Sequence, residues 1–307
     1  MIFGRRGMYR LIILIVITVT ISACGGQPAA REASGTAAPD ILTTSTILAD
    51  LARNVAGDRL DVESLLPVGA DPHSYQPTPQ DTAKISEAKV LIINGAEYEH
   101  FLEPLLENAG GERTLIEASA GLRLRTDAES EHGVDPHLWL DPNNVIAYVE
   151  NIREGLIHFD PDGAQTYRAN ANAYTAQLQE LDGWIEEQVA QIPAERRALV
   201  TNHEALGYFA ERYGFTVVGT IIESFSSDAS PSAQQMADLI DQIKGHEAPA
   251  IFLDASDNPA LAQQIAAETG VTVVTDLHLE SLTDGAPTGT YIDLMKYNVT
   301  KLVEALK

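Results

Sequence analysis

One long amphipathic segment, beginning at Pro161, constrains the fold of this chain more than any other feature. Apolar residues recur in it every three or four positions, at Ala164, Tyr167, Ala171, Tyr174, Leu178, Leu181 and Ile185. That spacing places one apolar stripe along a helix of about 25 residues, roughly 38 Å long at about 1.5 Å per residue. Because such a helix is longer than a small lobe is wide, we expect residues 161–192 to link two lobes.

Short apolar runs alternate with helical patterns on both sides of this segment. Before it, the patterns predict strands at 41–45, 62–68 and 90–94 and helices at 47–55, 78–88 and 101–109. After it, they predict strands at 198–201, 216–221, 250–253 and 271–274 and helices at 204–213, 232–244, 259–269 and 292–305. This alternation is typical of parallel sheets covered by helices. The predicted fold is therefore α/β, with two similar lobes joined by one long rigid helix.

The N-terminal residues are typical of an exported lipoprotein. Three arginines precede an apolar run at 11–19, and Ile21-Ser22-Ala23-Cys24 resembles a bacterial lipobox. We expect a signal peptide at 1–23, cleavage before Cys24 and lipid on its sulfur; the alternative is an incidental cysteine in a discarded leader. Because Cys24 is the only cysteine, no disulfide is expected to support the fold.

Composition then suggests the remaining boundaries. Residues 24–39 contain mostly Gly, Ala, Ser and Pro and are interpreted as the lipidated cysteine and a flexible tether. We expect an N-terminal lobe at 40–160, the linking helix at 161–192 and a C-terminal lobe at 193–307. The chain carries 44 acidic and 20 basic side chains, a net charge of −24. Such a surface repels nucleic acid and favours cations.

The tripeptide Asp-Pro-His occurs twice, as Asp71-Pro72-His73 and as Asp135-Pro136-His137. Each copy is followed by further prolines, which restrict the backbone and make these segments stiff and poorly helical. Two histidines presented on similar stiff loops suggest a shared ligand. The alternative, that both are turn residues whose side chains only bond their own loops, has equal weight on this pattern alone.

The second lobe offers two matching side chains. His203 follows the strand predicted at 198–201 and is expected to begin the next helix, whereas Asp276 is expected at the end of the strand near 271–274. A lone residue of either type at such a place is most often a helix cap. Because ligands bind at the carboxyl ends of parallel strands, four such residues, two from each lobe, favour a common metal site. The metalloprotease motif H-E-x-x-H is excluded because Gly207 stands where its second histidine is required.

Four stretches in a fixed order, DPHSYQPTP, DPHLWLDP, TNHEALGYFAERYG and TYIDLMKYNVTKLVEAL, resemble the solute-binding lipoproteins of ABC importers for zinc and manganese. The resemblance extends from about Ile41 to the C-terminus. It implies that two lobes hold one metal ion per chain, with His73, His137, His203 and Asp276 as ligands. It also implies an ABC permease as partner, a monomeric chain and an extracytoplasmic, membrane-anchored location in the periplasm or at the cell surface.

The ligand set suits a borderline divalent ion. Three imidazoles and one carboxylate favour Zn²⁺, at Zn–N distances of about 2.0–2.1 Å, whereas Mn²⁺ would gain from a second carboxylate in place of His203. Closed four-coordination leaves no position for a reactive water, so the site is expected to bind its ion without catalysis. We also expect affinity to fall once the pH drops below about 6.5, because protonated imidazoles cannot ligate.

Two other functions remain open on the sequence alone: a surface adhesin lipoprotein, and a zinc-dependent hydrolase with Glu204 as general base. Many zinc members of the family have a long His-rich loop before the second motif, whereas this chain has RTDAESEHGV, in which the role of His132 is open. Trp139 is expected to pack beneath its loop with its indole N–H bonded. The other histidines are interpreted as surface or capping groups: His100, His158, His246 and His278.

Overall fold

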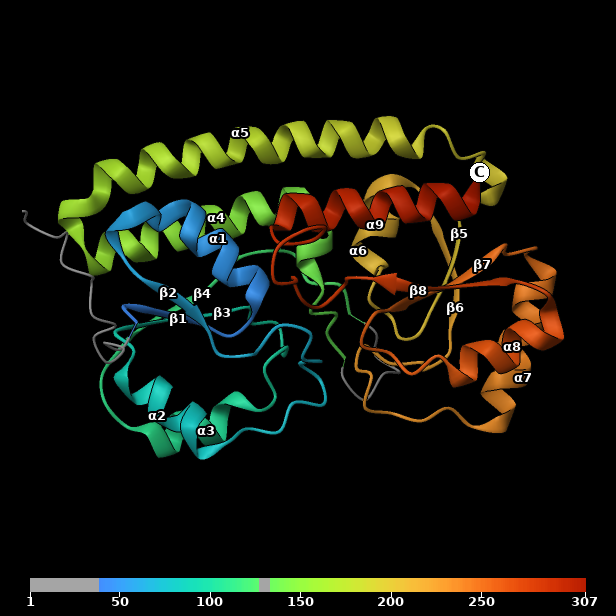
Figure 1. Cartoon of the computed structure of the whole chain (residues 1–307), viewed down its shortest axis with the longest axis horizontal. Coiled ribbons are helices and arrows are strands. Elements are labelled where there is room, and N and C mark those ends of the chain that lie inside the picture. Colours follow the sequence, from blue (N-terminus) through green and yellow to red (C-terminus); the bar gives the residue numbers. More distant parts are fainter. Residues whose placement is uncertain (1–38, 127–132) are drawn as a thin grey trace, which may run out of the picture. The chain divides into compact units, whose positions relative to one another are not determined.

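The computed structural model describes residues 39–126 and 133–307 (Figure 1). The predicted signal peptide, Cys24 and all of the predicted tether except its last residue lie outside these ranges, as does His132. Within the described ranges, no helix is both long enough and apolar enough to span a membrane.

The first lobe is a parallel four-stranded sheet between two layers of helices. Its strands are β1 (Ile41–Thr43), β2 (Val62–Ser64), β3 (Val90–Ile93) and β4 (Thr114–Glu117), in the order β2-β1-β3-β4. Its helices are α1 (Thr46–Ala56), α2 (Pro79–Glu87), α3 (Leu102–Ala109) and α4 (Pro142–Phe159). Figure 1 shows α1 and α4 on one face of the sheet and α2 and α3 on the other.

Successive residues of the central strands enter different cores, because side chains alternate between the two faces of a sheet. Val90 and Ile92 pack in the cluster that includes α1 and α4, whereas Leu91 packs in the cluster beneath α2 and α3. A strand buried on both faces is therefore apolar at every position, which is the pattern that predicted β3.

Two elements of this lobe were not predicted. The edge strand β4 lacks a continuous apolar run, and its Leu115 is 53% exposed. The helix α4 begins at Pro142, directly after Asp141, whose side chain accepts a hydrogen bond from Asn143 N. The prediction treated Asp-Pro as poorly helical, but a proline in the first helical turn after an aspartate cap is favourable.

The second lobe repeats the topology of the first. Its strands are β5 (Ala198–Thr201), β6 (Thr216–Thr220), β7 (Ala250–Asp254) and β8 (Thr272–Leu277), all parallel, in the order β6-β5-β7-β8. Its helices are α6 (Gly207–Tyr213), α7 (Ala233–Gly245) and α8 (Ala260–Thr269). Numbered within each lobe, both sheets therefore have the strand order 2-1-3-4, as expected of two similar lobes.

Two helices connect the lobes. The long helix α5 (Ala164–Val189) contacts α1 and α4 of the first lobe and also α9 (Tyr291–Leu306), which follows the last strand of the second lobe (Figure 1). Its stripe of buried residues is the predicted one, from Tyr167 to Ile185, extended to Val189. One continuous apolar core runs from α1 through α5 and α9 to α6. A shared core of this kind makes α5 a rigid link, because well-packed interiors resist deformation.

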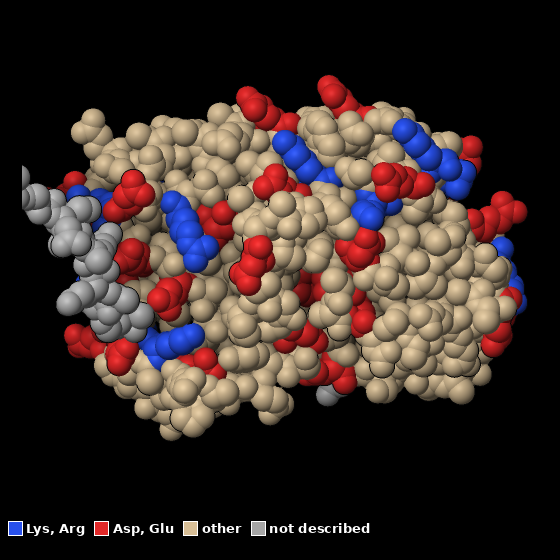
Figure 2. All heavy atoms as spheres, in the orientation of Figure 1, with Lys and Arg blue, Asp and Glu red and all other residues tan. Residues whose placement is uncertain are grey.

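Acidic side chains are spread over the face shown in Figure 2, with fewer basic side chains between them. This distribution agrees with the 44 acidic and 20 basic residues of the chain. Such a surface attracts cations toward the molecule.

Candidate metal centre

Four buried side chains, two from each lobe, converge between the sheets. They are His73, His137, His203 and Glu280, and their potential ligand atoms all lie within 4.8 Å of one another. The most exposed of them, His73, retains 9% of its accessible surface, and His137 retains none. All four stand outside regular helices and strands, and His203 and Glu280 follow the ends of β5 and β8. Loops at these strand ends therefore supply two of the four side chains, as parallel sheets predict.

The three imidazoles form a nearly equilateral triangle. Their ring centroids are 5.4 Å apart for His73 and His137, 5.3 Å for His73 and His203, and 5.2 Å for His137 and His203. His137 Nε2 lies 3.3 Å from His203 Nε2, and Glu280 Oε1 lies 3.1 Å from the first and 3.4 Å from the second. A tetrahedral ion with bonds of about 2.0–2.1 Å has ligand-to-ligand edges of about 3.3–3.4 Å. These three separations match such edges closely.

Two atoms of the cluster have no hydrogen-bond partner among the described residues: His73 Nε2 and Glu280 Oε1. Buried polar atoms are normally hydrogen-bonded, so these two atoms require an explanation, although Glu280 Oε1 is in ion-pair contact with His137 and His203. A bound cation supplies one, because it accepts electron pairs from both atoms at once.

The repeated tripeptide forms the same local turn in both places. Asp71 Oδ1 accepts a hydrogen bond from His73 N at 3.0 Å, and Asp135 Oδ1 accepts one from His137 N at 3.0 Å. An aspartate that bonds the backbone two residues ahead forms an Asx turn, a purely local structure. The sequence repeat therefore fixes how both histidines leave the backbone.

Asp135 also determines which nitrogen of His137 faces the cluster. Its Oδ1 lies 2.9 Å from His137 Nδ1, and both side chains are fully buried. Because Nδ1 is engaged, Nε2 is the nitrogen available to a ligand. Burial lowers the pKa of His137, but the carboxylates of Glu280 and Asp135 outweigh burial and raise this pKa to about 9.

The pKa shifts of His73 and Glu280 also follow from burial and from neighbouring charges. Burial lowers the pKa of His73 well below its usual value, and the neighbouring histidines add to this effect. Burial alone would raise the pKa of Glu280, but the nearby imidazoles, His137 above all, hold it well below its usual value. The cluster of the metal-free protein therefore contains an ionised carboxylate beside a neutral His73.

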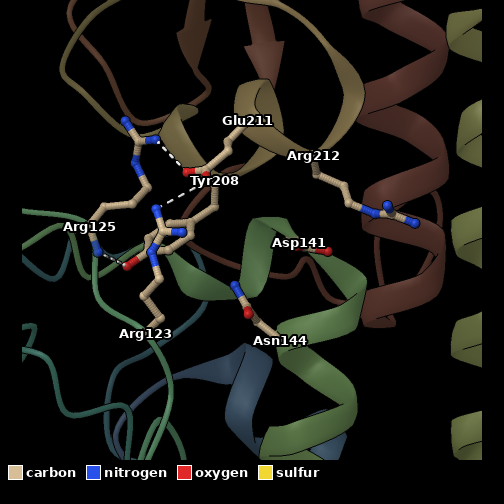
Figure 3. A pocket seen from close by; sticks show the side chains of 7 residues that line it. All are labelled: Arg123, Arg125, Asp141, Asn144, Tyr208, Glu211 and Arg212. Atoms are coloured by element: carbon tan, nitrogen blue, oxygen red, sulfur yellow. Dashed lines mark hydrogen bonds and ion pairs between the residues drawn. The ribbon is translucent and has the colours of Figure 1, made fainter.

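A network of polar contacts joins Asp135 to the second lobe. Arg125 Nε donates to Asp135 Oδ2 at 3.2 Å, and Arg125 Nη1 pairs with Glu211 of α6 at 3.0 Å. Arg123 reaches the same carboxylate at 3.2 Å, and Figure 3 shows both arginines directed toward Glu211. The Tyr208 hydroxyl accepts from Arg125 N and donates to the carbonyl oxygen of Asp135. Arg212 points away from this group (Figure 3) and pairs with the Asp182 carboxylate of α5.

His203 lies in a loop and not at a helix start. The sequence predicted a helix that begins at Glu204, but α6 begins at Gly207. Thr201 Oγ1 and Ala205 N both donate to the carbonyl oxygen of His203, at 2.6 and 2.9 Å. These two bonds hold residues 201–205 in a tight turn, which directs the His203 ring into the cluster.

Asp276 does not join the cluster, contrary to the ligand set expected from the sequence. Its carboxylate pairs with Lys301 Nζ at 2.7 Å and accepts from the Tyr297 hydroxyl at 2.8 Å, and its side chain is 45% exposed. The hydrogen bond from Lys301 lowers the pKa of Asp276. The reason is strand alternation: Leu277, its neighbour in β8, is fully buried, so Asp276 points to the opposite side.

Glu280, which the sequence reasoning missed, occupies the fourth position. It follows β8 by three residues, and distant groups hold its loop in place. Asp254 Oδ2 accepts from Leu279 N at 2.6 Å, and Trp139 Nε1 donates to Leu279 O at 2.9 Å. The second bond confirms that the indole N–H of the buried Trp139 is bonded. The only hint in the sequence is that Glu280 stands between two apolar residues, Leu279 and Leu282, which the structure buries.

The chain is similar to a known protein family and to individual proteins named for the metals that they bind. The family described as "Zinc-uptake complex component A periplasmic" matches residues 41–305. The manganese-binding lipoprotein MntA of Halalkalibacterium halodurans is 36% identical over 295 residues, covering 96% of this chain and 97% of its own. The iron-binding protein YfeA of Yersinia pestis is 34% identical over 267 residues, covering 86% of this chain and 85% of its own.

The fold is also similar to those of solved periplasmic metal-binding proteins. The periplasmic zinc-binding protein TroA of Treponema pallidum superposes with a TM-score of 0.80 at 28% identity, covering 87% of this chain and 99% of its own. A manganese-bound periplasmic metal-binding protein of Candidatus Liberibacter asiaticus superposes with a TM-score of 0.77 at 29% identity, with the same coverage.

Two parallel-sheet lobes with a buried histidine and glutamate cluster between them define a substrate-binding protein of the metal ABC transporters. The chain belongs to the zinc-uptake complex component A family, whose model spans nearly all of the described residues. It is accordingly a binding protein and not an enzyme, and the hydrolase alternative is set aside on the family relationship.

Proposed function

We propose that this protein captures one divalent transition-metal ion per chain, with His73, His137, His203 and Glu280 as its ligands. The observation that carries the proposal is the convergence of three imidazoles and one ionised carboxylate, all buried and contributed equally by the two lobes. Buried ionisable groups persist when they are paired or bind metal. A closed set of four ligands favours binding and release over catalysis.

Zinc is the ion that this ligand chemistry supports best. Nitrogen is the preferred donor type for Zn²⁺, and the separations around Glu280 Oε1 and His137 Nε2 are close to tetrahedral edges. Manganese is the second candidate, because MntA is named for manganese and the Candidatus Liberibacter asiaticus protein was solved with it. Direct competition between the two ions distinguishes these candidates.

We further propose delivery of the ion to an ABC permease by a monomeric protein anchored through lipidated Cys24 outside the cytoplasm. Relatives named as lipoproteins support the anchor, and the lipobox-like residues before Cys24 agree with it. In this proposal residues 1–23 are removed, residues 24–39 are the tether, and residues 40–160 and 193–307 hold the ion on either side of the link at 161–192.

Metal content and thermal unfolding of the purified full-length protein test the binding site. We expect one equivalent of metal, and stabilisation of about 2.7 kcal/mol when free metal reaches about a hundred times the dissociation constant. His137→Ala should abolish both effects. His246→Ala, which removes an exposed histidine at the C-terminal end of α7, is the matched control and should retain them. Full metal binding by His137→Ala would contradict the proposed ligand set.

A further inference from the structure

The two oxygens of the Glu280 carboxylate have different surroundings. Oε1 faces His137 Nε2 and His203 Nε2 at 3.1 and 3.4 Å. Oε2 accepts a hydrogen bond from the Tyr98 hydroxyl, with the two oxygens 3.4 Å apart. A carboxylate binds a metal through one oxygen or through both, so a donor on Oε2 bears on which mode is available.

The Tyr98 ring is held from two sides. It is 1% exposed and makes edge-to-face contacts with Trp139, at 5.0 Å between ring centroids, and with His73, at 5.8 Å. Aromatic pairs in this arrangement are attractive, and close packing prevents a large ring from changing rotamer. The hydroxyl is therefore fixed on the Glu280 side of the cluster.

The backbone that carries Tyr98 is strained. Three consecutive residues before it have positive φ angles: Gly95 at 80°, Ala96 at 51° and Glu97 at 61°. Two of them are not glycine, and such residues cost free energy in the left-handed region. The half-buried Glu99 carboxylate maintains the turn by accepting from Asn94 N at 2.6 Å and from Gly95 N at 3.1 Å. A turn supported in this way sets the position of Tyr98 closely.

We propose that Tyr98 is a positioning residue that keeps Glu280 a one-oxygen ligand and so favours a four-coordinate ion, zinc, over manganese. This inference rests on the proposed function, because it assumes that Glu280 ligates the ion. With Oε2 engaged by the phenol, three nitrogens and Oε1 complete a tetrahedron, which suits Zn²⁺. Mn²⁺ prefers more oxygen ligands, and the second oxygen that would serve it is the one that Tyr98 holds.

Tyr98→Phe tests the proposal, because it removes only the hydroxyl. We expect the ratio of manganese to zinc affinity to rise by about threefold, less than the roughly tenfold effect of a hydrogen bond of ordinary length to a charged group, because the two oxygens are 3.4 Å apart. Competition titrations of the full-length protein with each metal measure this ratio. Tyr174→Phe is the matched control, since the Tyr174 hydroxyl also bonds a buried carboxylate, Asp50, at 3.4 Å, but in the contact of α5 with α1. An unchanged ratio in Tyr98→Phe, or equal shifts in both variants, would overturn the proposal.

A second measurement uses the wild-type protein and covers the case in which Tyr98→Phe does not fold. Cobalt absorbs visible light strongly when four-coordinate and weakly when six-coordinate, and a crystal structure of the zinc-loaded protein shows the Glu280 oxygens directly. Strong cobalt absorption with Glu280 bound through one oxygen supports the proposal. Binding through both oxygens overturns it but leaves the proposed function intact, whereas a wild-type protein that binds none of these metals overturns the proposed function itself.

Discussion

Asp135 and His137 form a buried pair in which one carboxylate oxygen, Oδ1, lies within 3.0 Å of both the backbone and the side-chain nitrogen of the histidine. The backbone bond belongs to the local turn, whereas the side-chain bond orients the imidazole. One residue thus sets both the path of the chain and the nitrogen offered to the ion.

We therefore expect Asp135→Asn to weaken metal binding by about 10–100-fold, the usual effect of altering the partner of a metal-binding histidine. An asparagine preserves the shape but removes the charge. Competition with a chromophoric chelator measures the change. Asp141→Asn is the control, because Asp141 caps α4 and asparagine caps a helix equally well. Equal losses in the two variants would show that the charge of Asp135 has no special role.

Neutralising each carboxylate in turn tests whether Glu280 or Asp276 is the fourth metal ligand. Glu280→Gln should weaken metal binding by more than about 100-fold, because a direct ligand contributes more than a neighbour of one. Asp276→Asn should leave affinity unchanged and alter the free energy of unfolding by less than about 1 kcal/mol, since its ion pair with Lys301 is partly exposed. The reverse result would restore the ligand set expected from sequence.

Metal binding should depend on pH over a higher range than the sequence suggested. Because the pKa of His137 is raised to about 9 in the metal-free protein, the imidazole must lose its proton to bind an ion at neutral pH. We expect affinity to rise by about tenfold per pH unit between about pH 6.5 and 9, with about one proton released per ion. Titration calorimetry at pH 7.5 in buffers of different ionisation heat counts that proton. Affinity that is flat over this range would contradict the raised pKa.

The stability of the metal-free protein should fall as the pH rises, whereas its metal affinity should rise. A histidine whose pKa is higher in the folded than in the unfolded state stabilises the fold below about pH 6.5, and this contribution disappears as the pH rises through about 9. We expect the free energy of unfolding in excess chelator to fall by a few kcal/mol, on the order of 3, over this interval. Urea unfolding measures it. His137→Gln should remove the pH dependence, and a variant that keeps it would assign the effect to another group.

Two helical glycines give a test of the packing in the first lobe and its link. A Cβ on Gly155 of α4 would approach Ile116 Cδ1 of β4 to 2.4 Å, whereas a Cβ on Gly183 of α5 would meet nothing within 4 Å. Gly183→Ala should stabilise the protein by about 0.5–1 kcal/mol, the usual gain in helix propensity. Gly155→Ala should destabilise it by about 1–3 kcal/mol, because overpacking outweighs that gain. Thermal unfolding measures the stability of both variants. Equal stabilisation by the two substitutions would show that α4 can move away from β4 without a cost in free energy.

Local patterns were sufficient for much of the architecture. The apolar stripe from Tyr167 to Ile185 predicted the linking helix, because the periodic signal repeats over about five turns. Fully apolar β3 was predicted for the same reason, whereas β4, with half-exposed Leu115 at the edge of the sheet, carried no such signal. The two Asp-Pro-His motifs predicted that His73 and His137 are presented in the same way. An Asx turn needs only residues adjacent in sequence, so this feature could be read locally.

What the sequence by itself determined, then, is the pair of α/β lobes, their helical link and three of the four clustered side chains. Only the tertiary structure decided that Glu280 and not Asp276 completes the cluster. That choice depends on the exposure of Asp276 and on bonds to the Glu280 loop from Trp139 and Asp254, residues remote in the chain. A strand pattern shows which residues alternate, but the path of the loop after it is set by partners that only folding brings near.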